Sequence, residues 1–326
     1  MKLALKLVIT CLLFAGLFWK IGGAGPIWTA LLRLDALLLL CVFALFHVDR
    51  LLMAFMWCRL LRAKGLELPL LTGTQIYCTS MLLGFFLPAT VGADAVRAFT
   101  TMRRGFDGNT VVASIAVERV FGFLSTLLLG LFGVVWISLH TELSRELQLV
   151  AWAAALFLLA GVLLALASFS TWLFTLFHDR ILQRFRTHPL VQRLRALHEN
   201  YRAYQTERGT LAFFFVLSGL KQLLPGVIVW LLLGGLGFDI SFMYVCGATA
   251  LAFTAARLPL SLSGLGVYEG SLLGLLALVG VPAAEAVTVG LVSRVLEIAC
   301  WLLWWFAWTL RTGGAERPRT SEAATP

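Results

Sequence analysis

Long apolar runs recur along the whole chain, and they restrict its fold more than any other feature. A helix needs about 20 mostly apolar residues to cross the hydrocarbon core of a bilayer. Of the 326 residues, 60% are hydrophobic and only 13% are charged, which is too little polar material to cover a soluble domain of this length. The runs lack the short alternating pattern of a membrane β-barrel. The sequence therefore predicts an all-α polytopic membrane protein.

Six of the apolar runs are long enough to predict full transmembrane helices. They cover residues 4–19, 36–58, 110–137, 148–177, 209–233 and 284–311. The first run has Lys2 and Lys6 at its start, which is the charge pattern of a signal peptide. No clear small-residue cleavage site follows it, and Trp19-Lys20 interrupts the place for one. We expect it to remain as the first membrane helix.

Two further apolar regions, 69–100 and 241–281, are interrupted at similar places. Each contains a Leu-Pro pair and small residues within sequence apolar enough to sit in lipid. We interpret each region as a re-entrant helical hairpin, with a pair of thin spans as the alternative. Broken helices at matching places in two halves of a membrane protein indicate a transport site. The breaking residues are Pro88 and Gly92 in the first region, and Pro259, Gly264 and Gly266 in the second.

The basic residues indicate how the chain crosses the membrane. The net charge of +9 falls in loops between apolar runs, which the positive-inside rule explains without a nucleic-acid partner. All the basic segments lie on one side if the two hairpins enter from opposite sides. We therefore expect a multi-pass protein of the bacterial inner (cytoplasmic) membrane, with both termini cytoplasmic and an inverted repeat. The basic segments are 59–68, 97–107, 178–208 and 311–319, against the poorer 20–35, 138–147 and 234–240.

We expect a single integral membrane domain over residues 1–311. Segment 178–208 mixes leucines with arginines, which favours an amphipathic helix on the cytoplasmic membrane surface over a solvated linker. The tail 312–326 is rich in Gly, Pro, Ser, Thr and Ala, so we expect it to be disordered. Faces of small residues make a homodimer conceivable.

Ionisable residues within apolar runs mark the candidate site, because a charge at the bilayer centre costs roughly 2.5–3.5 kcal/mol. Asp94 and Arg97 are three residues apart at the start of the half-helix after the first break, so they share a face. Free backbone N–H groups at a helix N-terminus and a planar guanidinium both suit an anionic head group. The alternative is a salt bridge that stabilises the loop.

Two acid–arginine pairs lie deeper. Glu118 and Arg119 are about 12 Å into the span 110–137, and Arg294 is about 15 Å into the span 284–311, with Glu297 one turn later. Two deep arginines facing one cavity would hold a lipid phosphate. The same residues would also serve as internal ion pairs that lock helices together, and both roles are compatible.

Some of the remaining charges within apolar runs suit a head-group site, and others suit a structural ion pair. Lys221 lies near the middle of its span, which favours a cavity-lining role. Arg257 precedes the second break and can extend to the interface. Glu269 begins the second half-helix, where the helix dipole alone favours a carboxylate. For the adjacent Asp49-Arg50 we expect a structural pair or a helix break.

No catalytic motif accompanies these charges. The five histidines have no metal spacing, the six cysteines form no C-x-x-C pair, and Gly264-x-Gly266 lacks the strand and third glycine of a dinucleotide fingerprint. No nucleophile elbow, Walker loop or paired-carboxylate motif is present. We therefore expect no metal, no cofactor and no enzymatic activity.

The two breaks and the deep charges carry a resemblance to a known family. Residues 86–97, FLPATVGADAVR, resemble the LP-x-x-x-GGD-x-x-R signature of the lysylphosphatidylglycerol synthase transmembrane family. Residues 258–270 resemble its second signature, lP-x-s-x-GG-x-G-x-x-E, and Glu118-Arg119 and Arg294 match its acid–arginine pair and closing-helix arginine. Ala93 and Ser263 replace glycines of these signatures.

The resemblance implies lipid translocation of the kind assigned to the flippase half of the multiple peptide resistance factor, without its lysine-transferring domain. We expect about six full transmembrane helices and two re-entrant hairpins. An anionic or glycosylated lipid (phospholipid, glycolipid or isoprenoid-linked) would cross through a polar groove between them. The alternatives are a membrane-embedded lipid head-group transferase and a non-catalytic subunit for envelope biogenesis.

Overall fold

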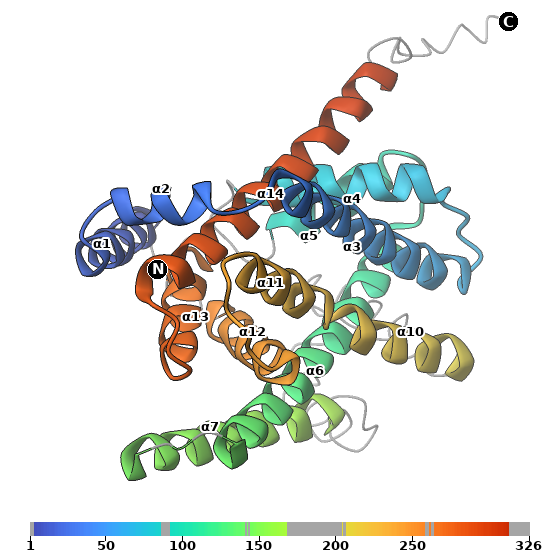
Figure 1. Cartoon of the computed structure of the whole chain (residues 1–326). Coiled ribbons are helices and arrows are strands. Elements are labelled where there is room, and N and C mark those ends of the chain that lie inside the picture. The colour runs from blue at the N-terminus through green and yellow to red at the C-terminus, as the bar shows by residue number, and fades with distance from the viewer. Residues whose placement is uncertain are drawn as a thin grey trace, which may run out of the picture.

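The computed structural model describes residues 3–85, 92–140, 142, 144–167, 204, 207–257, 261 and 264–312. Within these residues every regular element is a helix, which confirms the all-α membrane class (Figure 1). The predicted amphipathic segment 178–208 lies outside the described residues apart from its last few positions, and so does the tail after residue 312.

Five helical stretches have the length and apolar character to cross a bilayer. Their bounds lie close to the predicted spans, although the end of the predicted span 148–177 falls outside the described residues. They are α3 (Ala36–Arg62), α6 (Gly108–His140), α7 (Arg145–Ala167), α10 (Arg208–Lys221) continued by α11 (Leu224–Gly235), and α14 (Ala283–Thr312).

The first predicted span is the helix α1 (Leu3–Ile21), which continues into a helix that was not predicted. This helix, α2 (Gly25–Leu32), meets α1 at 76°, and the two form a sixth candidate span if they are counted together. Gly22 and Gly23 make the bend with φ angles of +82° and +102°, which glycine adopts readily. Pro26 then lies in the first turn of α2, where its missing N–H costs nothing.

Each predicted hairpin contains two short helices. The first consists of α4 (Leu70–Phe85) and α5 (Gly92–Met102), and the second of α12 (Phe242–Ala256) and α13 (Val267–Ala277). At 1.5 Å per residue, α4 and α12 are each only about 23 Å long, which is shorter than the roughly 30 Å hydrocarbon core. Re-entry of the hairpins stays a prediction.

The breaks fall where the sequence places them. Pro88, Pro259 and Ser263 lie outside the described residues, but Gly92 begins α5. Gly264 and Gly266 have φ angles of +76° and +78° just before α13.

The two halves of the chain repeat one another. The second helix of each hairpin, α5 or α13, has the same length and is followed directly by a long membrane helix, α6 or α14. The packing repeats too, because α4 lies against α14 whereas α12 lies against α6, so each hairpin rests on the long helix of the other half. The hairpins also pack against the preceding helix of their own half, α4 on α3 and α12 on α11. This arrangement agrees with the predicted repeat, whose opposite orientations in the membrane stay a prediction.

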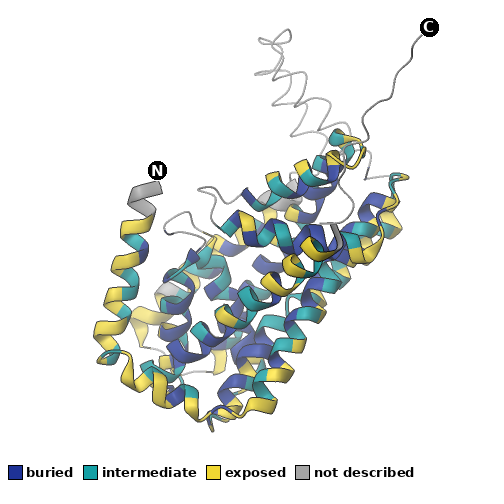
Figure 2. Cartoon of the chain, turned by 90° about the horizontal axis from the view of Figure 1, so that it is seen from above, coloured by how far each residue is buried: buried dark blue, intermediate teal, exposed yellow. Residues whose placement is uncertain are grey.

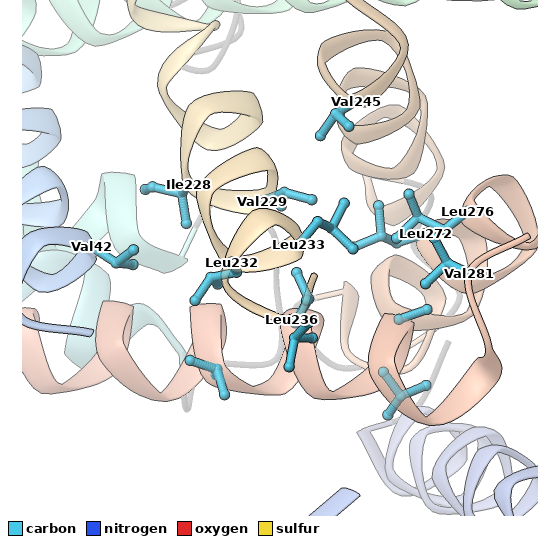
Figure 3. Close-up of a cluster of buried hydrophobic side chains, with 14 of the residues drawn as sticks. Val42, Ile228, Val229, Leu232, Leu233, Leu236, Val245, Leu272, Leu276 and Val281 are labelled. Atoms are coloured by element: carbon cyan, nitrogen blue, oxygen red, sulfur yellow. The ribbon is translucent and has the colours of Figure 1, made fainter. Parts of the chain in front are cut away.

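The largest hydrophobic cluster joins α11, α12, α13 and α14 with residues of α2 and α3, such as Val42 (Figure 3). Leu232, Leu233 and Leu272 are fully buried in it. Buried residues occupy the middle of the bundle and residues not covered by protein lie on its outside (Figure 2). Many of the latter are large and apolar, such as Leu156 and Phe157 on α7, as expected for a surface that contacts lipid.

Candidate functional site

The first group of charges is centred on a buried ion pair between α5 and α6. Arg97 is 1% exposed, and its Nη1 lies 2.9 and 3.1 Å from the two carboxylate oxygens of Glu118. The Tyr77 hydroxyl on α4 donates a further hydrogen bond to Glu118 at 2.9 Å. The rings of Trp57 and Tyr77 lie 4.9 and 4.6 Å from the guanidinium carbon. Arg97 is thus enclosed by acids and aromatic rings.

Asp94 connects this pair to Arg119. Its carboxylate receives two hydrogen bonds of 2.7 Å from Arg119, and one of 3.3 Å from Arg97, the one-turn contact that the sequence predicts. The Arg119 side chain is 45% exposed, whereas that of Asp94 is only 16% exposed. The chain Arg119–Asp94–Arg97–Glu118 therefore alternates in sign from the surface to the interior. We call these four residues the first network.

Ala93, which replaces a glycine of the family signature, packs directly against Gly84 on α4. A Cβ atom built on Gly84 would meet the Cα and Cβ of Ala93 at 2.5 Å. The glycine that permits close approach of α4 and α5 is therefore on α4 rather than at position 93. Any larger residue at Gly84 would force the hairpin apart.

The second group of charges joins α3, α10, α13 and α14. Asp49 and Arg50 form a close ion pair on α3, and the Lys221 ammonium lies 3.2 Å from Asp49. Arg50 lies 3.6 Å from Glu297. We call the complete chain of six charged residues the second network: Lys221, Asp49, Arg50, Glu297, Arg294 and Glu269.

Arg294 continues the second network toward the second hairpin. It donates to Glu297 one turn later at 3.0 Å, and its Nε lies 3.8 Å from Glu269. Glu269 is fully buried, and its other oxygen accepts the backbone N–H of Gly266 at 2.7 Å. The carboxylate thereby caps α13 and faces Arg294 at the same time.

Most of the second network lines a cavity of about 740 Å³, including its open mouth. Asp49 and Arg50 lie on its wall within the unbroken helix α3, so the expected helix break at this pair is wrong. Their ion pair itself is confirmed. The charged residues of the wall are Asp49, Arg50, Lys221, Arg257, Arg294 and Glu297, among apolar neighbours such as Phe46, Ile228 and Phe253.

Arg257 stands apart from both networks. Its Nη2 donates to the hydroxyl of Thr126 on α6 at 2.9 Å, and its guanidinium lies 5.5 Å from the ring of Phe123. The side-chain amide of Gln222 donates to the same hydroxyl. No carboxylate of the described residues lies within ion-pair distance of Arg257.

A known family matches nearly the whole chain. The family described as the lysylphosphatidylglycerol synthase TM region matches residues 3–304. The chain belongs to this family. No curated protein matches it. Membership and the apolar helices together make it a multi-pass membrane protein tied to lipid handling.

Each half of the chain contains an equivalent acid–arginine pair. Asp94 on α5 contacts Arg119 on α6, and Glu269 on α13 faces Arg294 on α14. In each pair the acid lies in the first turn of the short hairpin helix, and the arginine lies on the long helix that follows it. The repeat seen in the helices thus extends to the charged side chains.

The predicted site residues fall into three places. Four form the first network, Arg257 lies alone, and the other four belong to the second network, where the structure adds Asp49 and Arg50. Asp49 and Arg50 are charges within an apolar run, and this signal alone would have included them among the site residues. The sequence does not show that Lys221 contacts Asp49 or that Glu297 contacts Arg50. Within the described part of the chain, no group of His, Cys, Asp and Glu has the arrangement of a metal site.

Proposed function

We propose that this protein is a lipid flippase of the bacterial inner membrane. The observation that carries the proposal is the cavity whose wall bears six charged side chains among apolar ones inside a membrane helix bundle. Charges at such depth are costly and generally mark the path of a polar solute. A lipid head group would pass through this cavity, and its acyl chains would stay in the bilayer beside the apolar outer face.

The ion pairs of the second network support such a path. An anionic head group that contacts Lys221 or Arg294 replaces Asp49 or Glu297 as the partner of that cation. The cation stays paired during the exchange, and the displaced Asp49 or Glu297 keeps Arg50 as a second cationic partner. This lowers the cost of moving a charged group through a medium of low dielectric constant. The acids would also keep the head group from binding too tightly to leave.

The first network would support the path rather than line it. Arg97 is enclosed by Glu118, Trp57 and Tyr77, which favours a role in holding α4, α5 and α6 in place. Arg119 is exposed enough to contact a head group. In the proposed orientation both termini are cytoplasmic, and the two hairpins enter the membrane from opposite sides.

The test is leaflet exchange in liposomes. Purified protein would be reconstituted with tail-labelled anionic, zwitterionic and glycosylated lipids, and exchange followed by quenching of the outer leaflet. We expect exchange by the wild type and its loss in Arg294→Gln. The matched control is Arg33→Gln, because Arg33 also pairs with a glutamate of α14, Glu285 at 3.3 Å, but does not line the cavity.

Two results would refute the proposal. Exchange no faster than in empty liposomes for every lipid class would exclude a flippase and favour a subunit for envelope biogenesis. A lipid recovered with an altered head group, detected by mass spectrometry, would favour a head-group transferase.

A further inference from the structure

The charges of the two networks cancel. The first network contains two arginines, Arg97 and Arg119, and two acids, Asp94 and Glu118. The second contains Arg50, Lys221 and Arg294 against Asp49, Glu269 and Glu297. Each cation in these networks therefore has a carboxylate partner, and each carboxylate has a cationic one.

Arg257 is the exception on the cavity wall. It faces the cavity with a hydroxyl and a phenyl ring as its neighbours, and no described carboxylate pairs with it. The Thr126 hydroxyl already donates to the carbonyl of Gly122 at 2.7 Å, so it serves Arg257 only as an acceptor. A guanidinium carries five N–H donors, and among the described residues Thr126 is the one side chain that accepts a hydrogen bond from Arg257. Among the described residues, no other hydrogen-bond acceptor contacts these donors.

These donors suit a phosphate. A planar guanidinium binds two oxygens of a phosphodiester through parallel hydrogen bonds, and such charge-assisted bonds are about twice as strong as neutral ones. The amide of Gln222 lies beside Arg257 on the same hydroxyl and lines the same cavity, so it adds a neutral polar contact for the rest of a head group. The wall offers a head-group amine no unpaired carboxylate among the described residues, because Asp49 and Glu297 both form ion pairs with cations.

We propose, on the basis of the flippase function above, that Arg257 anchors the phosphate of the transported lipid. The cavity then selects lipids whose head groups carry one net negative charge. While bound at Arg257, a phosphodiester with an uncharged remainder neutralises the guanidinium without separating an ion pair of either network. A zwitterionic or cationic head group brings an ammonium that has to separate Asp49 or Glu297 from its partner.

The test compares three tail-labelled lipids in the same liposomes: phosphatidylglycerol, phosphatidylethanolamine and lysyl-phosphatidylglycerol. We expect exchange of phosphatidylglycerol to exceed that of the other two by roughly tenfold or more. Arg257→Gln removes this preference, whereas Arg257→Lys keeps part of it because it keeps the charge. The matched control is Arg103→Gln, since Arg103 also lies over a phenyl ring, that of Phe99 at 5.2 Å, but is outside the cavity.

Each outcome bears on one of the two proposals. Equal exchange of the three lipids, or a preference that survives Arg257→Gln, overturns the selectivity and leaves the flippase standing. If no lipid exchanges, the flippase is refuted, and native mass spectrometry of the same proteins then tests the anchor alone. Phosphatidylglycerol retained by the wild type and by Arg103→Gln, but lost from Arg257→Gln, supports the anchor. Equal retention of all three lipids by the wild type overturns it.

Discussion

Replacing Glu118 by glutamine tests whether the buried pair with Arg97 holds the first hairpin in place. The substitution keeps the size of the side chain and one oxygen for the Tyr77 hydroxyl, but removes the negative charge. Both side chains are nearly inaccessible, at 1% exposure for Arg97 and 6% for Glu118. Water can therefore replace little of what is lost.

The expected magnitude follows from this geometry. At an effective dielectric constant of about 20, unit charges about 3 Å apart attract by roughly 5.5 kcal/mol. Arg97 keeps a second acid, Asp94 at 3.3 Å, which offsets part of the loss. Removing one partner of a buried pair costs about 3–5 kcal/mol, so we expect Glu118→Gln to lower the free energy of unfolding by about 3 kcal/mol.

The assay is reversible unfolding by sodium dodecyl sulfate in mixed micelles, followed by circular dichroism. A double-mutant cycle with Arg97→Gln isolates the pair. The loss in free energy of unfolding of the double variant should be smaller than the sum of the two single losses by at least about 2 kcal/mol. Glu207→Gln serves as the control, because Glu207 is 39% exposed and lies 3.8 Å from Lys64. Exposed pairs of this kind contribute about 0–1 kcal/mol. Additive losses in the cycle would refute the reasoning.

Three further predictions concern single contacts and use the same unfolding assay. Asp107→Ala removes the carboxylate that caps α6 through the N–H of Thr110 at 2.8 Å, and should cost about 1 kcal/mol, whereas Asp107→Asn should be nearly neutral. Gly133→Val should prevent α6 from meeting α12 at Gly247, with a loss of at least about 3 kcal/mol; a stable variant would contradict the close crossing. Lys221→Met should lower the free energy of unfolding by about 1–3 kcal/mol, because the buried carboxylate of Asp49 loses a cationic partner. A second change, Asp49→Asn, should restore part of that loss.

The membrane helices could be predicted because lipid imposes one requirement on every span. Length and apolar character were enough to find α3, α6 and α14, and the Leu-Pro breaks were enough to find both hairpins. The bend into α2 was missed, because Gly22 and Gly23 look like an ordinary loop and only the structure shows that the chain re-enters a helix at once. Apolar length and Leu-Pro breaks thus located the helices, but they did not predict the bend between α1 and α2.

The candidate site was predictable residue by residue but not pair by pair. The cost of a charge in lipid singled out Glu118, Arg119 and Arg294, which all contact acids or arginines of other helices. The one-turn spacing correctly paired Asp94 with Arg97, since both lie on one helix. The contact between Asp94 and Arg119 joins two helices and depends on how α5 folds back on α6, which no local pattern encodes.

The division of the charges between the two networks has a consequence for how the chain is made. All residues of the first network are synthesised by position 119, so they can pair as soon as α6 enters the membrane. Asp49 and Arg50 have only each other until Lys221 and then Glu297 emerge. From Arg50 to Lys221 the chain grows by 171 residues, which takes roughly 9–34 s at about 5–20 residues per second. During that time α3 carries this adjacent ion pair in the membrane without the partners that it has in the complete fold.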